Sequence, residues 1–169
     1  MLEPILGESP ALCCTISLPC SPNPAWIERM TDDSEQIRRI IAMWEQAVQS
    51  RDLAGTLAHH ASDIVMFDVP EPIQAIGLEQ YRETWELFFA YSAGGEASFH
   101  LHELAVIVGD TVAVAHALLD AADDKCRLTM ALQKFGDEWM IVHEHHSSPW
   151  PNPRETGQKS ENPEAAPRP

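Results

Sequence analysis

Residues 126–148, CRLTMALQKFGDEWMIVHEHHSS, constrain the fold more than any other stretch of this chain. Two runs, 126–135 and 138–147, alternate between two kinds of side chain, and Gly136 and Asp137 lie between them. Successive side chains of a strand point to opposite faces, and Gly and Asp tolerate the positive φ of a tight turn. The stretch therefore predicts an antiparallel hairpin.

The second strand of this hairpin is rich in histidine. Strict alternation places four side chains on one face: Trp139, Ile141, His143 and His145. The opposite face would then carry Met140, Val142, Glu144 and His146. Because an apolar core does not need two imidazoles, we expect His143 and His145 to line a pocket, unless one of them points to a subunit interface or to the frayed end of the strand.

The chain upstream of the hairpin predicts helices and one strand. Apolar residues at helical spacing predict a first helix from Asp32, with Glu35 completing a capping box. A short helix is expected over 53–61 and a strand over 63–69, which Pro70 ends because proline cannot donate to a ladder. A third helix follows, with an apolar stripe of four aromatic residues: Tyr81, Trp85, Phe88 and Phe89.

Two further strands are expected over 98–108 and 111–121, so the chain runs from helices into an antiparallel meander. The fold class is therefore α+β, with a curved, mostly antiparallel sheet wrapped over the helices and enclosing a pocket. We expect a proline-rich, disordered leader over 1–30, a folded domain over 31–150 and a disordered proline-rich tail over 151–169.

Composition narrows the classes of partner. The 169 residues carry a formal net charge of −15, which argues against binding to nucleic acid or to an anionic membrane surface. The four cysteines show no disulfide or zinc spacing, which favours a cytoplasmic location. No dinucleotide fingerprint occurs, and we expect no cofactor and no metal, although Asp68, His143 and His145 are formally suitable metal ligands.

The order of elements resembles the nuclear transport factor 2-like superfamily, nearest its SnoaL-like and ketosteroid-isomerase-like branches. The resemblance rests on SRDLAGTLAHHASDIVMFDVPEPIQAIG, on the aromatic helix after Gly77 and on GDEWMIVHEHHSS. It implies a cone-shaped α+β barrel. The last segment is also similar to the association domain of calmodulin-dependent kinases, which ends in a comparable strand.

The resemblance also assigns positions. Asp68 matches the general-base aspartate of the ketosteroid isomerases, Trp44 their oxyanion-hole tyrosine, and Ala131 falls near their second acid. Neither Trp44 nor Ala131 is an obvious donor for a dienolate oxygen, so we do not predict a steroid isomerase.

Our candidate catalytic residues are Asp68, His143 and His116, and the candidate ligand-binding residues are Trp44, Met66, Trp85, Arg127, Thr129 and His145. Burial is expected to raise the pKa of Asp68 and to lower that of His143. Several candidates also have a structural interpretation: Asp68 as the cap of the following turn, His116 as a core histidine, Arg127 as a surface ion pair, and Trp44 and Trp85 as core aromatic residues.

Two functions remain open. The first is an isomerase, cyclase or dehydratase that acts on a small hydrophobic or polar metabolite, with Asp68 as general acid or base and a histidine as its partner. The second is a non-catalytic ligand-binding or oligomerisation domain. A homodimer is expected through the outer face of the sheet, where the small side chains of Ala113, Ala115 and Ala117 would allow close approach.

Overall fold

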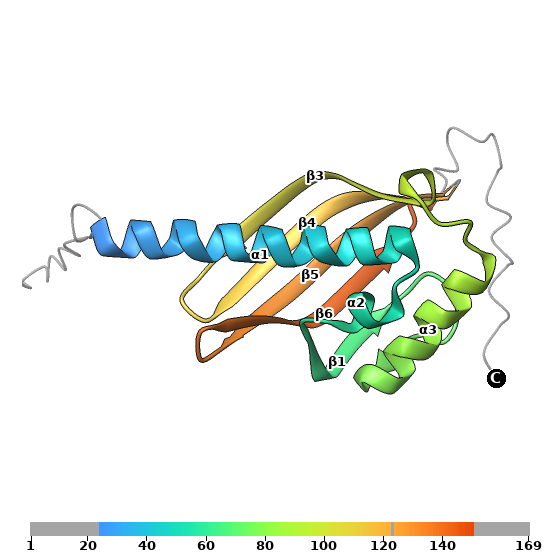
Figure 1. The fold of residues 1–169 in the computed structure, drawn as a ribbon, viewed down its shortest axis with the longest axis horizontal. Coiled ribbons are helices and arrows are strands. Elements are labelled where there is room, and N and C mark those ends of the chain that lie inside the picture. Colours follow the sequence, from blue (N-terminus) through green and yellow to red (C-terminus); the bar gives the residue numbers. More distant parts are fainter. Residues whose placement is uncertain (1–23, 123, 151–169) are drawn as a thin grey trace, which may run out of the picture.

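The computed structural model describes residues 24–122 and 124–150, and the side chains from Asp32 onward. Its elements, in chain order, are α1 (Pro24–Ser50), α2 (Leu53–Leu57), β1 (His60–Phe67), β2 (Ala75–Ile76), α3 (Gly77–Tyr91), the 3₁₀ turn η1 (Glu96–Ser98), β3 (Phe99–Val108), β4 (Val112–Ala121), β5 (Asp124–Phe135) and β6 (Glu138–Ser147) (Figure 1). The rest of the expected leader and the whole of the expected tail lie outside these residues. No helix within them is long and apolar enough to cross a membrane.

The six strands form one open sheet in the order β2-β1-β6-β5-β4-β3. All neighbours are antiparallel except β1 and β6, which are parallel. The sheet curves, with α1 crossing its concave face and α3 lying beside β1 and the edge strand β2 (Figure 1). The α+β class and the curved sheet over helices are therefore confirmed.

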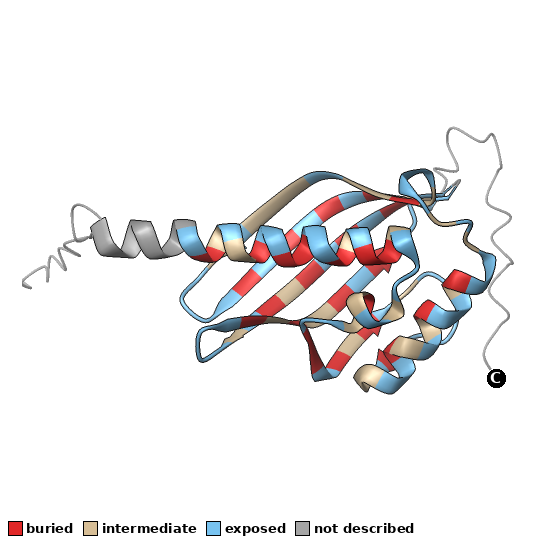
Figure 2. Ribbon diagram, viewed as in Figure 1, coloured by how far each residue is buried: buried red, intermediate tan, exposed pale blue. Residues whose placement is uncertain are grey.

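The core lies between α1 and the concave face of the sheet. Helix α1 buries a stripe at helical spacing, which includes Ile37, Ile41, Trp44 and Val48. Strand β5 buries Leu128, Met130 and Leu132, and buried positions alternate with exposed ones along β4 and through the middle of β5 (Figure 2). This alternation defines a concave inner face and a solvent-exposed outer face.

A bulge in β6 overturns the predicted orientation of the histidines. Ala131 pairs with His143 and Leu132 pairs with Ile141, so Val142 is an extra residue opposite β5. Shifting a strand by one residue moves its side chains to the other face. After the bulge, Glu144 and His146 are the buried side chains, whereas His143 is half-buried and His145 is exposed.

The alanines of β4 also face the opposite way from the prediction. Ala113, Ala115 and Ala117 are buried on the inner face, where they pack in the core cluster rather than on a dimer surface. The outer face of β4 instead carries Val112, Val114, His116 and Leu118, all exposed. The alternation along β4 was predicted correctly, but the prediction of which set of side chains faces outward was wrong. Both sets contain apolar side chains, so the pattern of β4 alone does not show which set is buried.

Helix α1 begins at Pro24, eight positions before the predicted start at Asp32. Proline is well tolerated at the first position of a helix, where its missing N–H would have no partner in any case. The acidic residues at 32 and 33 therefore lie inside α1 and do not cap it. The short helix also differs from its prediction, since α2 ends at Leu57 and β1 begins at His60.

Asp33 ties α1 to the β5–β6 hairpin. Its Oδ1 accepts hydrogen bonds from Lys134 Nζ at 2.6 Å and from the buried Trp139 Nε1 at 3.0 Å. The carboxylate is 6% exposed, so water does not replace a lost partner easily.

Asp33→Asn should lower the free energy of unfolding by about 1–3 kcal/mol, because it removes the charge opposite Lys134 in a nearly dry contact. Asp32→Asn, one residue earlier and exposed, is the matched control and should change stability by less than about 0.5 kcal/mol. Urea unfolding of both variants measures the difference. Equal effects would show that the Asp33 contacts do not stabilise the fold.

Candidate active site

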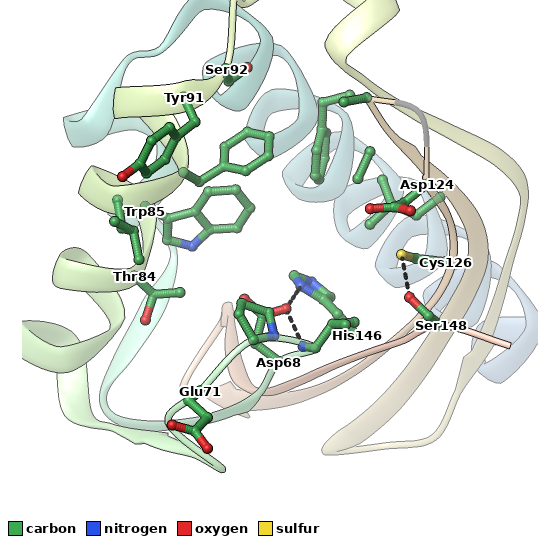
Figure 3. Close-up of a pocket in the computed structure, with 18 of the residues that line it drawn as sticks. Asp68, Glu71, Thr84, Trp85, Tyr91, Ser92, Asp124, Cys126, His146 and Ser148 are labelled. Carbon is green, nitrogen blue, oxygen red and sulfur yellow. Dashed lines mark hydrogen bonds and ion pairs between the residues drawn. The ribbon is translucent and has the colours of Figure 1, made fainter. Parts of the chain in front are cut away.

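A cavity of about 1010 Å³ opens at one end of the sheet. Its walls come from α3, from the turn after β1 and from the ends of β3, β4, β5 and β6 that meet there (Figure 3). Trp85, Phe88, Phe99 and Leu119 make much of the wall apolar. A concave, largely apolar cavity with a few polar groups is the usual form of a small-molecule site.

Asp68 and His146 form an ion pair on the wall of this cavity. His146 Nδ1 lies 3.3 Å from Asp68 Oδ1, and both side chains line the cavity (Figure 3). Asp68 directly follows β1, where the N–H of Val69 donates to Oδ1 at 2.8 Å. His146 is 7% exposed and reaches the cavity because the β6 bulge turns it inward.

Pairing reverses the pKa shifts that burial alone would produce. Burial raises the pKa of Asp68, but the hydrogen bond and charge of His146 and the Val69 amide outweigh it, so the pKa falls below its ordinary 3.8. Burial lowers the pKa of His146, but Asp68 and the charge of Glu144 outweigh it, so the pKa rises above its ordinary 6.5. The expected upward shift for Asp68 was therefore wrong.

A buried polar cluster lies behind His146. Glu144 Oε1 lies 2.7 Å from His60 Nε2 and accepts a hydrogen bond from the Tyr81 hydroxyl at 2.9 Å. Trp44 Nε1 donates to that hydroxyl at 3.1 Å. The second oxygen, Oε2, lies 3.6 Å from His146 Nε2. The cluster thus links α1, α3, β1 and β6 to the wall of the cavity.

Two of the predicted site residues line the cavity, Asp68 and Trp85. Trp44 and Met66 are buried in the core and do not line it. Trp44 packs edge-on against Trp85, with ring centroids 5.6 Å apart, and so supports the wall from behind. Its indole N–H is committed to Tyr81, which leaves it no free donor for a ligand.

The other predicted site residues lie on the outer face of the sheet. His116, Thr129 and His145 are direct neighbours across β4, β5 and β6, and all three are exposed. Arg127 is exposed on the same face of β5. His143 Nδ1 lies 2.7 Å from the Val65 carbonyl oxygen, so this ring is held against β1. The structure does not bring these five side chains to the cavity.

The residues that sequence reasoning missed are His146, Glu144, His60 and Tyr81. The first two were assigned to the wrong face because a bulge leaves no mark in a pattern of alternation. A usable signal was the run His-Glu-His-His itself, since a carboxylate between imidazoles favours a polar cluster. Among the described residues, no three His, Cys, Asp or Glu side chains gather to hold a metal ion, and Asp68, His143 and His145 do not converge.

Comparison with known proteins places this architecture in a family. The family model for the SnoaL-like domain matches residues 37–151. The chain belongs to the SnoaL-like domain family. This family lies within the nuclear transport factor 2-like superfamily that the sequence resembles, so the resemblance is confirmed. No curated protein matches the chain.

Solved structures share the fold. A nuclear transport factor 2-like protein of unknown function from Pseudomonas putida is 32% identical, with a TM-score of 0.65, and the match covers 72% of this chain and 89% of that one. A candidate ketosteroid isomerase from Parabacteroides distasonis is 25% identical, with a TM-score of 0.54 and coverage of 66% and 86%. A candidate scytalone dehydratase from Novosphingobium aromaticivorans is 12% identical, with a TM-score of 0.62 and coverage of 73% and 89%.

The Asp68–His146 pair should make stability depend on pH in a defined direction. The raised pKa of His146 contributes stability that is complete below its unfolded value of about 6.5 and is lost as pH rises through the folded value. The lowered pKa of Asp68 contributes stability that is present above about 4 and is lost as pH falls through the folded value. The pair therefore stabilises most in mildly acidic solution.

Asp68→Asn should lower the pKa of His146, because it removes a hydrogen-bonded charge and leaves the desolvation in place. NMR titration of the histidine ring protons measures this, with His146 assigned from His146→Gln. The variant should also lose less stability than the wild type between mildly acidic and alkaline solution. An unchanged His146 pKa would mean that the two side chains are not paired in solution.

Proposed function

We propose that the cavity is the active site of a cofactor-independent enzyme that moves protons on a small ring-shaped metabolite, of the dehydratase or isomerase type. The observation that carries this proposal is the Asp68–His146 pair, a charged acid–base couple on the wall of a largely apolar cavity. Perturbed titratable groups in a cleft are typical of catalytic sites.

The two side chains suit complementary roles. Asp68, with its lowered pKa, is ionised at neutral pH and can accept a proton. His146, with its raised pKa, is available as an imidazolium that can donate one. In an elimination of water, Asp68 would take the proton from the carbon while His146 protonates the departing hydroxyl.

The contact between the two groups would then return both to their starting protonation states. After the elimination, Asp68 is protonated and His146 is neutral. Transfer of that proton across the 3.3 Å contact restores the starting state without another group. Because a lowered pKa makes Asp68 a weak base, the substrate needs an activated C–H bond, such as one next to a carbonyl group in a β-hydroxy ketone.

The lining favours an uncharged substrate. Acidic side chains at the cavity include Glu71, Glu83 and Asp124, and the described lining contains no lysine or arginine. An anionic ligand would meet repulsion from these carboxylates, and the cationic ring in the described lining, His146, is already paired with Asp68. Aromatic walls formed by Trp85 and Phe88 suit the flat face of a ring.

Relatives of the same fold support the class of reaction by analogy. Among the structural neighbours are the candidate scytalone dehydratase and the candidate ketosteroid isomerase. Because one fold hosts many functions, the analogy agrees with this class of reaction, but the proposal rests on the Asp68–His146 pair. The non-catalytic alternative remains a ligand-binding domain that uses the same cavity.

Catalysis can be tested with a panel of cyclic β-hydroxy ketones and β,γ-unsaturated ketones, whose conjugated products absorb in the ultraviolet. Any turnover should fall by about 10²–10⁴-fold in His146→Gln and in Asp68→Asn. His145→Gln is the matched control, since it changes a histidine one residue away on the outer face. Full activity in His146→Gln would contradict the roles assigned here. A panel compound that binds without turnover would favour the binding-domain alternative.

We also propose a homodimer through the outer face of the sheet. The chain carries 26 acidic and 11 basic residues, so two copies repel each other unless they meet where carboxylates are absent. The outward side chains of 112–118, 127–133 and 143–145 include none. Exposed Val112, Val114 and Leu118 supply apolar area there, a role that the buried alanines of β4 cannot fill.

Val114→Asp should weaken self-association at least about tenfold, because it buries a carboxylate at the centre of the dimer. Ile73→Asp is the control: Ile73 is 89% exposed and lies in the turn between β1 and β2. Sedimentation equilibrium measures both. A wild-type protein that remains monomeric at tens of micromolar would contradict the dimer.

A further inference from the structure

Glu144 is a carboxylate with no exposed surface, directly behind the wall of the cavity. Burying an isolated carboxylate costs free energy, so contacts with partner groups must offset that cost. Oε1 contacts His60 Nε2 at 2.7 Å and Tyr81 at 2.9 Å, and Oε2 faces His146 Nε2 at 3.6 Å. Glu144 therefore lies between two imidazoles, one in the core and one at the cavity.

The hydrogen bonds of His60 show where hydrogens lie on its ring. His60 Nδ1 lies 2.9 Å from the carbonyl oxygen of Ala58, which can only accept, so Nδ1 carries a hydrogen. Nε2 lies 2.7 Å from Glu144 Oε1, a separation that two bare acceptors do not adopt. A proton therefore lies between Nε2 and Oε1, on the side of Glu144 away from His146.

Contacts around Tyr81 hold Glu144 in place. The Tyr81 hydroxyl donates to Oε1, and burial together with the Glu144 charge keeps the pKa of Tyr81 well above its ordinary 10.0. Trp44 Nε1 donates to the same hydroxyl, which also lies 3.0 Å from His60 Nε2. The His60 ring packs against the Tyr81 ring at a tilt of 33°, with ring centroids 4.6 Å apart. With Oε1 held in this way, Oε2 is directed at His146.

We propose that Glu144 is a positioning residue that holds His146 as an imidazolium, with Nδ1 turned towards Asp68 and Nε2 turned away from the cavity. The charged groups that face the His146 ring are Asp68, which follows β1, and Glu144 on β6. The indole rings of Trp44 on α1 and Trp85 on α3 also lie beside it, with ring centroids 6.4 and 6.2 Å away.

This arrangement leaves His146 one ring nitrogen that can exchange a proton with the cavity. Nε2 has no hydrogen-bond partner within the described residues and faces only the Glu144 charge at 3.6 Å. Proton exchange with the cavity must therefore pass through Nδ1, on the Asp68 side. The inference concerns the state of the histidine, so it holds whichever ligand the cavity takes and does not depend on turnover.

Glu144→Gln tests the proposal by NMR titration of His146. Removing a facing carboxylate should shift the His146 titration down by about one pH unit, a tenfold fall in the ratio of charged to neutral ring at a given pH. Tyr81→Phe removes a hydrogen bond but no charge, so its shift should be smaller. Glu138→Gln, an exposed carboxylate on the same strand, is the control and should leave His146 unchanged. A shift in Glu144→Gln no larger than in Glu138→Gln would overturn the proposal.

The wild-type protein provides a test that does not require a buried variant to fold. Long-range ¹H–¹⁵N spectra distinguish an imidazolium, in which both ring nitrogens carry hydrogens, from either neutral tautomer. At about pH 6, His146 should show hydrogens on both nitrogens. A neutral ring there would overturn the proposal. Loss of turnover in the activity panel would bear on the proposed reaction alone, since neither NMR measurement depends on catalysis.

Discussion

The burial of Glu144 is the constraint on which the site depends. A carboxylate without solvent is stable only when its partners are fixed, and here they come from three other elements: His60 from β1, Tyr81 from α3 and, through Tyr81, Trp44 from α1. These contacts join the helices to the sheet at the point where the cavity begins. Within this cluster Oε1 of Glu144 is hydrogen-bonded, whereas Oε2 faces only the His146 ring.

Much of the fold could be predicted from the sequence, because periodicity and turn residues are local. The β5–β6 hairpin, the strand before Pro70 and the aromatic face of α3 all follow from spacing alone. Helix α1 was predicted too short, because the apolar spacing becomes regular only after Asp32 whereas the helix begins at Pro24. Its first turns are not encoded by an amphipathic pattern.

The candidate site was less predictable than the fold. Asp68 and Trp85 were found because position along a strand and helical spacing place them. His146 was missed for the opposite reason: its face depends on Val142, an extra residue that only pairing with β5 reveals. The direction of the Asp68 pKa shift could not be predicted either. Burial raises this pKa and pairing with His146 lowers it, and the sequence did not reveal that His146 is the partner.

The bulge at Val142 has a consequence for how related chains are aligned. Strand β6 contains two sets of potential acid–base residues: Glu144 and His146 face inward, and His143 and His145 face outward. Inserting or deleting one residue before His143 would turn the outward set inward and the inward set outward. Two homologues with the same histidines could therefore hold different chemistry, and two with different histidines could hold the same. Column-by-column identity in this strand is a poor guide to shared activity unless the gap is placed from the pairing of the strands.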